Sequence, residues 1–192
     1  MSTIATKQAE LSLPSIRMTV EEFEKTDFYN DKRLELLDGY IVRRGEMNPP
    51  HAVITGRLRR RIDRMLPADW FTREDKPVQI PPLYEPLPDI AIVRGEDENY
   101  IDHHPGPADI AALIEVSDAT LSKDQGKKLA AYALNGIAVY WIVNLVDHQV
   151  ELYTEPNADA YGSKLVFTVG QSVPVIIDGA VVGHLAVSDI LS

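Results

Sequence analysis

Apolar and polar positions alternate with a helical period in three segments of the chain. Thr19, with Glu22 three residues later, forms a capping-box pattern at the start of the first segment. The second segment begins with an asparagine and two prolines and carries apolar side chains at helical spacing, which is typical of an amphipathic helix. Ser122 and Gln125 repeat the capping-box pattern ahead of the third segment. The predicted helices are residues 21–29, 48–67 and 123–135.

Period-two patterns and short apolar runs predict the strands. Asp38 and Gly39 lie between two alternating runs, which is typical of a β-hairpin, and Glu35 lies on the first strand of that hairpin. Two apolar runs farther along, one starting at Asp89 and the other containing Glu115, predict short buried strands. The predicted strands outside the hairpin are residues 70–80, 89–93, 110–118, 138–143, 149–154 and 164–169, followed by a second short hairpin.

The order of these elements sets the fold class. Helix, hairpin, helix, several strands, helix and further strands predict an α/β (mixed α+β) fold in which helices flank a central mixed β-sheet. A chain of 192 residues, 45% of them hydrophobic, is long enough for one domain with a substantial core. Residues 1–16 are polar and have no period, so we expect a mobile N-terminal arm followed by a single domain over residues 17–192.

Composition excludes several classes of site. The chain has no cysteine, which removes disulfides, thiolate catalysis and cysteine-based zinc sites, so a metal would be held by oxygen or imidazole. It has no apolar run near 18 residues and no signal-peptide pattern, so we expect a cytoplasmic protein without a membrane span. No G-x-S-x-G, P-loop or G-x-G-x-x-G motif is present, so serine-hydrolase and nucleotide-binding functions lack their required parts.

The charge of the chain argues against indiscriminate nucleic-acid binding. The formal net charge is −10 and the isoelectric point is near 4.9, whereas Lys and Arg supply most of the non-specific affinity for phosphate. One block, RLRRRIDR over residues 57–64, is strongly basic and includes Arg57 and Arg60. A solvated helix face is the interpretation that composition favours for this block, and a surface that contacts phosphate is the alternative.

Two acidic residues stand in segments that otherwise predict buried strands. Asp89 begins the run DIAIV, and Glu115 lies inside AALIEV. An unpaired carboxylate at low dielectric costs several kcal/mol, and two together cost more unless a cation lies between them. A hard divalent ion such as Mg²⁺ binds carboxylate, carbonyl and water oxygens and needs few protein ligands. The alternatives are that Asp89 starts its strand in solvent and that Glu115 faces a wet edge or pairs with a lysine.

Several motifs together resemble a known family. The motifs are RLELLDG at residues 33–39, the region of His51, KPVQIP at 76–81, Pro88-Asp89, Glu115-Val116-Ser117 and residues 128–144. Taken in order, they resemble the Uma-type endonuclease family, a branch of the PD-(D/E)XK restriction-endonuclease-like superfamily, over about residues 17–192. The PD pair and the E-x-S motif are weak signals alone, and the order and spacing of all the motifs carry the resemblance.

The resemblance implies a metal-dependent DNA endonuclease that hydrolyses phosphodiester bonds. By analogy, Asp89 and Glu115 would hold Mg²⁺ or Mn²⁺, and Val116 would contribute its backbone carbonyl. Glu35 matches an early acidic position of the family and is a further possible ligand. His51 matches a recurrent histidine that would contact phosphate or a metal-bound water. Restriction-type folds often act as homodimers, so a homodimer is expected.

One superfamily residue is missing. The pattern places a lysine two residues after the second acid, where this chain has Ser117. On the predicted helix that follows, Lys128 lies four residues from both Asp124 and Tyr132, so these three side chains share a face. The family pattern K-L-x-x-Y also aligns with Lys128 and Tyr132. We therefore predict that Lys128 is a displaced catalytic lysine, and the alternative is an ordinary surface ion pair between Asp124 and Lys128.

Three functions remain open from the sequence. The first is a Mg²⁺-dependent DNA endonuclease with Asp89, Glu115 and Lys128 as its catalytic residues. The second is a nuclease-fold binding or structural protein with little or no turnover, which the net charge and the missing lysine favour. The third is a hydrolase of a smaller phosphoester. Residues predicted to contact substrate or support the site are His51, Ser117, Asp124, Tyr132, Arg57 and Arg60.

Overall fold

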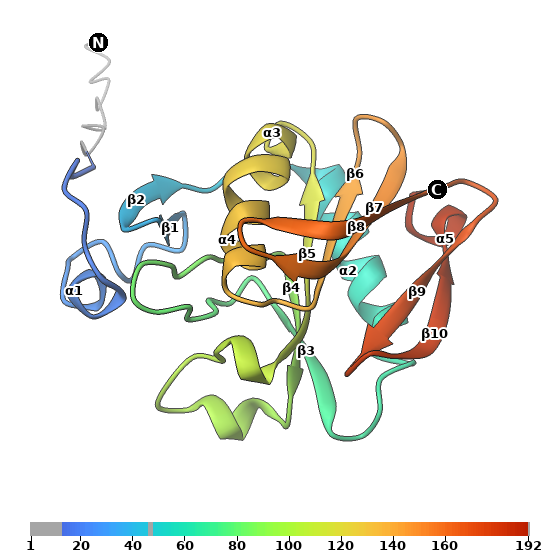
Figure 1. Ribbon diagram of the computed structural model, residues 1–192, viewed down its shortest axis with the longest axis horizontal. Helices are drawn as coiled ribbons and strands as arrows, with labels where there is room; N and C mark the ends of the chain where they lie inside the picture. The colour runs from blue at the N-terminus through green and yellow to red at the C-terminus, as the bar shows by residue number, and fades with distance from the viewer. Residues whose placement is uncertain (1–12, 46–47, 192) are drawn as a thin grey trace, which may run out of the picture.

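The computed structural model describes residues 13–45 and 48–191, so most of the predicted N-terminal arm lies outside the described residues. A six-stranded sheet runs through the middle of the molecule, with helices on both of its faces (Figure 1). The strands of this sheet are β3 (Trp70–Glu74), β4 (Ile90–Arg94), β5 (Ile110–Ser117), β6 (Val139–Asn144), β7 (Gln149–Asn157) and β8 (Ala160–Thr168), in that spatial order. Strands β5 and β6 are parallel and every other neighbouring pair is antiparallel. The predicted mixed α+β fold with a central mixed sheet is confirmed.

The remaining elements surround this sheet. Two short hairpins lie outside it, one near the N-terminus and one near the C-terminus. The hairpins are β1 (Leu34–Leu37) with β2 (Tyr40–Arg43), and β9 (Ser172–Ile177) with β10 (Ala180–Ala186). The helices are α1 (Val20–Glu24), α2 (Pro49–Ile62), α3 (Leu121–Lys123), a π-helical turn at Asp124–Lys128, α4 (Leu129–Leu134) and α5 (Val187–Leu191). Two 3₁₀ turns, Asp97–Tyr100 and Pro107–Asp109, lie between β4 and β5.

Alternation along β5 divides its side chains between the two faces of the sheet. Ile114 belongs to a core that also contains Leu58 of α2, the inner side of the β9–β10 hairpin and α5. Leu113 belongs to a second core, on the opposite face, that contains Tyr132 of α4. Because side chains of a strand alternate, Glu115 lies on the same face as Leu113, beneath α4. The strand is buried along its whole length, so its one carboxylate must find partners inside the protein.

A third apolar cluster joins the N-terminal segment to the hairpin. Phe23 of α1 packs with Leu34 and Leu36 of β1, and Leu13 packs against the same cluster. A backbone bridge between Leu36 and Glu85 ties the hairpin to the loop before β4. The end of β2 is therefore held beside the start of β4, where the candidate site lies.

Several sequence-based element predictions are confirmed. Thr19 accepts a hydrogen bond from the Glu22 backbone N–H, and the Glu22 side chain completes the capping box. The hairpin turns at Asp38 and Gly39, both of which have a positive φ. Asn48 caps α2 through its side chain, as the amphipathic pattern predicts.

Several predictions about elements are wrong. The helices predicted over residues 21–29 and 48–67 end earlier, at Glu24 and Ile62. The strand predicted over residues 70–80 ends at Glu74, because Asp75 adopts a left-handed φ of 51° that turns the chain out of the pairing with β4. Ser122 does not cap a helix, since it is the second residue of α3, and the N-cap position belongs to Thr120 in a helical conformation. The segment after α3 also contains the π-helical turn, so it is not one regular α-helix.

Candidate active site

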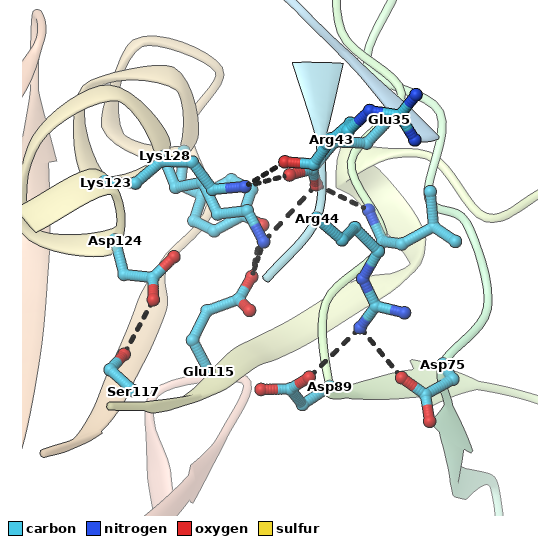
Figure 2. Close-up of polar contacts among 12 residues, drawn as sticks. Glu35, Arg43, Arg44, Asp75, Asp89, Glu115, Ser117, Lys123, Asp124 and Lys128 are labelled. Atoms are coloured by element: carbon cyan, nitrogen blue, oxygen red, sulfur yellow. Dashed lines mark hydrogen bonds and ion pairs between the residues drawn. The ribbon is translucent and has the colours of Figure 1, made fainter. Parts of the chain in front are cut away.

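The ends of five elements surround a pocket of about 70 Å³. Asp89 comes from the start of β4, Glu115 from β5, His51 from the first turn of α2, and Lys128 from the π-helical turn. Arg44, directly after β2, closes the pocket from the hairpin side. Figure 2 shows the acidic side chains interleaved with the basic ones.

Asp89 and Glu115 stand on neighbouring antiparallel strands. Ile90 pairs with Ile114, so continuing this register by one residue places Asp89 opposite Glu115. The Val116 backbone N–H donates a hydrogen bond to Oδ2 of Asp89 at 2.7 Å. The structure thus brings together the two acids that the sequence singled out, on one face of the sheet.

Asp89 is only 4% exposed and is surrounded by cations. Nε2 of His51 lies 3.0 Å from its Oδ2, and the Arg44 guanidinium donates to its Oδ1 at 3.1 Å. Burial alone would raise the pKa of Asp89, but the hydrogen bond and charge of His51 and the charge of Lys128 hold that pKa below its usual value. Burial would lower the pKa of His51, but the hydrogen bond and charge of Asp89 raise it overall. The raised pKa favours the protonated imidazole.

Glu115 takes its hydrogen bonds from the helix above it. Nζ of Lys128 donates to its Oε1 at 2.8 Å, and the Tyr132 hydroxyl donates to the same oxygen at 2.9 Å. Burial raises the pKa of Glu115 above its ordinary range, against the stabilising charge of Lys128. Burial would lower the pKa of Lys128, but the charges of Glu115 and Glu35 outweigh burial and raise that pKa. Lys128 therefore carries a positive charge in a buried position.

Glu35 faces the lysines and does not line the pocket. Its Oε1 pairs with Nζ of Lys123 at 2.5 Å, its Oε2 lies 3.4 Å from Nζ of Lys128, and the Leu87 backbone N–H donates to Oε2 at 3.2 Å. Burial would raise the pKa of Glu35, but Lys128 and Lys123 lower it overall. The carboxylate of Glu35 thus orients two basic side chains beside the pocket (Figure 2).

Ser117 and Asp124 form a separate contact at the back of the pocket. The Ser117 hydroxyl donates to Oδ2 of Asp124 at 2.8 Å. Oδ1 of Asp124 is buried and has no hydrogen-bond partner among the described residues. Lys128, at 3% exposure, bonds to Glu115 and Glu35, so the alternative of a surface ion pair between Asp124 and Lys128 is wrong.

The structure does not bring the arginine block of α2 to the pocket. Arg57 donates to the Ile190 carbonyl at 3.4 Å, and Arg61 pairs with Asp189 at 3.0 Å. Arg60 is exposed, and neither Arg57 nor Arg60 lines the pocket. Only the N-terminal end of this helix, with His51, reaches the site.

Sequence reasoning missed Arg44. One nitrogen of its guanidinium contacts both Asp75 at 2.8 Å and Asp89 at 3.1 Å. The signal in the sequence is weak, since Arg44 is an arginine that directly follows the last residue of the hairpin, Arg43. Lys123, at the end of α3, also lines the pocket.

The oxygen atoms that the pocket offers are of the kind that a hard cation binds. Two carboxylates face one pocket from adjacent strands, and both hydrogen bonds to Glu115 go to Oε1. Within residues 13–45 and 48–191, no group of three or more histidine, aspartate or glutamate side chains is arranged to hold a metal ion. Because Mg²⁺ keeps several waters and takes one or two carboxylates, Asp89 and Glu115 with a backbone carbonyl fit it without a third acidic side chain.

None of the helices in the described part of the chain is long and apolar enough to cross a membrane.

Comparison with known proteins identifies the family. No curated protein matches the chain. A crystal structure of a protein from Anabaena variabilis, titled as a "putative nuclease belonging to DUF820", superposes with a TM-score of 0.72 over 91% of this chain and 97% of that one, at 18% sequence identity. That likeness shows the shared fold. The model of the Uma2 family, described as "Putative restriction endonuclease", matches residues 20–182. The chain therefore belongs to the Uma2 family of restriction-endonuclease-like proteins.

Proposed function

We propose that the chain is a divalent-metal-dependent DNA endonuclease whose catalytic residues are Asp89, Glu115 and Lys128. The observation that carries the proposal is the placement of two buried acids opposite each other on β4 and β5, with a buried lysine bonded to one of them. Membership of a nuclease family supports the reaction class. Fold alone does not fix a substrate, so the site has to carry the argument.

Asp89, Glu115 and the Val116 carbonyl are the groups that would hold the metal. Mg²⁺ or Mn²⁺, when bound, supplies Lewis-acid stabilisation of the scissile phosphate and activates water. The role of the strands is to fix both carboxylates rigidly on one face of the sheet. The Val116 backbone N–H orients Asp89 by donating to its Oδ2 at 2.7 Å.

Lys128 supplies the positive charge that the missing lysine would have supplied. The position two residues after Glu115 is occupied by Ser117, which donates to Asp124. Lys128 enters from the following helix, and its Nζ reaches Glu115 at 2.8 Å. Fixed charges aimed at developing negative charge are often the largest single contribution to catalysis. His51 lies on the opposite side of Asp89, in the first turn of α2, where a protonated imidazole would contact a phosphate oxygen.

A substrate panel tests the reaction class. Supercoiled plasmid and bis(4-nitrophenyl) phosphate are incubated with the native chain and with Glu115→Gln, in Mg²⁺, in Mn²⁺ and in EDTA. We expect nicking of the plasmid that requires the divalent ion and is lost in Glu115→Gln. Hydrolysis of the small ester without nicking would favour the smaller-phosphoester hydrolase and contradict the endonuclease.

One observation favours a second candidate, a binding or structural protein with the same fold. Both acids at the pocket already contact cations, Asp89 through Arg44 and Glu115 through Lys128. A metal ion must compete with these internal partners. Absence of nicking together with absence of Mn²⁺ binding by calorimetry would favour this second candidate.

The proposal extends to the assembly and the location of the protein. We place residues 17–192 in one nuclease domain preceded by an arm, in a cytoplasmic protein. A homodimer would let two sites cut the two strands of a duplex. Light scattering coupled to size-exclusion chromatography should give twice the chain mass of 21.4 kDa, and a single chain mass would contradict the dimer.

A further inference from the structure

Arg44 occupies a position between two carboxylates that belong to different strands. Asp89 precedes β4, and Asp75 follows β3, the edge strand next to it. A single guanidinium nitrogen of Arg44 lies 2.8 Å from Oδ1 of Asp75 and 3.1 Å from Oδ1 of Asp89. Figure 2 shows this side chain between the two acids, with a dashed line to each. The contact uses one of the two carboxylates that the proposed function assigns to the metal.

The backbone around this bridge is fixed. The Arg44 N–H donates to the Arg33 carbonyl at 2.8 Å, which extends the hairpin. The Asp75 N–H donates to the Asp89 carbonyl at 3.2 Å, and Asp75 holds a left-handed φ of 51°. Because the main chains of Arg44 and Asp75 are both held by hydrogen bonds, a rearrangement of this bridge requires the Arg44 side chain to move and not the backbone.

The two carboxylates differ in exposure. The side chain of Asp89 is 6% exposed and that of Asp75 is 31% exposed, while the Arg44 side chain is 15% exposed. Arg44 also lines the same pocket as Lys123. An arginine that leaves Asp89 keeps a partner in the more exposed Asp75, so its release does not leave a buried charge without a partner.

Resting on the proposed function, we infer that Arg44 is a substrate-contacting residue that pairs with Asp89 until a divalent cation binds there. The cation and the guanidinium compete for the same carboxylate. When the cation binds, Arg44 keeps its contact with Asp75 and turns its remaining N–H groups to a phosphate of the nucleic acid. A planar guanidinium with several donors suits a phosphate oxygen pair.

The competition predicts opposite changes in cation affinity for two variants. Arg44→Gln removes the competing charge, so its affinity for Mn²⁺ by calorimetry should rise about tenfold, the equivalent of one charge-assisted hydrogen bond. Asp75→Asn leaves Arg44 with Asp89 alone, so its Mn²⁺ affinity should fall. Arg43→Gln is the matched control, because Arg43 is the adjacent arginine and is exposed, and its Mn²⁺ affinity should stay within about twofold of native.

Binding to a DNA duplex supplies a second readout. In saturating Ca²⁺, the anisotropy of a labelled duplex should report weaker binding by Arg44→Gln, with a salt slope reduced by about 0.9 for one lost phosphate contact. The salt slope of duplex binding by Arg43→Gln should equal that of the native chain. Thermal unfolding in EDTA establishes whether each variant is folded. If Arg44→Gln is not folded, the Mn²⁺ affinity of Asp75→Asn tests the inference.

The outcomes separate this inference from the proposed function. Mn²⁺ binding that is native in Arg44→Gln and Asp75→Asn but lost in Asp89→Asn would overturn the role of Arg44 and leave the metal site standing. An unchanged salt slope in Arg44→Gln would overturn its contact with phosphate. Absence of Mn²⁺ binding by the native chain would overturn the proposed function, and this inference with it.

Discussion

Three buried acids at or beside the pocket each meet a base. Glu115 meets Lys128, Glu35 meets Lys123 and Lys128, and Asp89 meets Arg44. Removing one partner from a buried pair leaves an uncompensated charge, which costs about 3–5 kcal/mol. The arrangement is therefore costly to alter one residue at a time, and paired substitutions are more informative.

The displaced lysine can be tested by moving it. Lys128→Met should lower the plasmid nicking rate about 100- to 1000-fold, because a fixed charge beside the phosphate is lost. Adding Ser117→Lys to that variant puts an ammonium at the superfamily position and should recover part of the rate. Lys127→Met, at the exposed neighbouring position, is the control and should nick at the native rate. A native rate in Lys128→Met would exclude a catalytic role for Lys128.

Glu85 gives a pH effect that is independent of the pocket. Burial raises its pKa to about 7, with a smaller contribution from Glu24. A carboxyl whose pKa is higher in the folded state stabilises the fold below its unfolded pKa near 4.5, and this stabilisation is lost as the pH rises through about 7. Native stability should thus fall by on the order of 2 kcal/mol between pH 4.5 and 8 through this group.

Urea unfolding at several pH values checks the Glu85 prediction. Glu85→Gln keeps the shape of the side chain and removes its titration, so its stability should vary less over this range. Glu98→Gln, at an exposed position, is the control and should keep the native pH dependence. The same pH dependence in Glu85→Gln and native protein would contradict the assignment.

At the scale of elements, the N-terminal end of α2 connects helix formation to the site. Asn48 accepts a hydrogen bond from the His51 N–H at 3.0 Å and donates to Asp118 at 3.1 Å. It therefore begins the helix and holds the loop after β5 against it. His51 is placed beside Asp89 by the same first turn.

Loss of this cap should be visible in stability. Asn48→Ala should reduce the free energy of unfolding by about 1 kcal/mol, the usual value of an N-cap. Asn48→Ser keeps a capping oxygen but not the amide that reaches Asp118, so it should restore most of that loss. Chemical denaturation measures both, and equal losses in the two variants would mean that the contact with Asp118 dominates.

Local patterns in the sequence were sufficient for some elements and not for others. The Asp38-Gly39 turn and the Asn48 cap depend on residues close in the sequence, and both predictions are confirmed. The apolar runs that start at Asp89 and contain Glu115 predicted two buried strands, which the structure pairs. The π-helical turn was missed because it depends on contacts of Lys128 with Glu115 and Glu35 from other elements.

The same distinction applies to the site. Asp89 and Glu115 stand out in the sequence because charge interrupts an apolar pattern. Arg44 does not, because an arginine after a hairpin is ordinary, and its partner Asp75 is 31 residues away. Contacts between loops leave no periodic signal, so Arg44 could not be assigned to the pocket from the sequence alone.

At the scale of the whole molecule, the site places basic side chains among acidic ones in a protein that is acidic overall. The net charge is −10, and one pocket is lined by the bases Arg44, Lys123, Lys128 and His51 together with the acids Asp89, Glu115, Asp118 and Asp124. Long-range attraction to DNA is weak for such a chain, so the proposed binding to DNA would depend on local contacts and on a bound cation. The layered fold holds these contacts by placing β4 and β5 side by side within the sheet, with the segment from α3 to α4 on one face of the sheet (Figure 1).

Asp89 and Glu115 are proposed to form the metal-dependent catalytic site of a nuclease. The most direct measurement is the initial rate of nicking of supercoiled plasmid in Mg²⁺ at low salt, for the native chain, Asp89→Asn and Asp159→Asn. Asp159 is exposed and does not line the pocket, so its variant controls for the loss of one negative charge. We expect nicking by the native chain and by Asp159→Asn at the same rate, and a nicking rate at least about 100-fold lower for Asp89→Asn. Equal nicking by Asp89→Asn and the native chain would contradict the proposal.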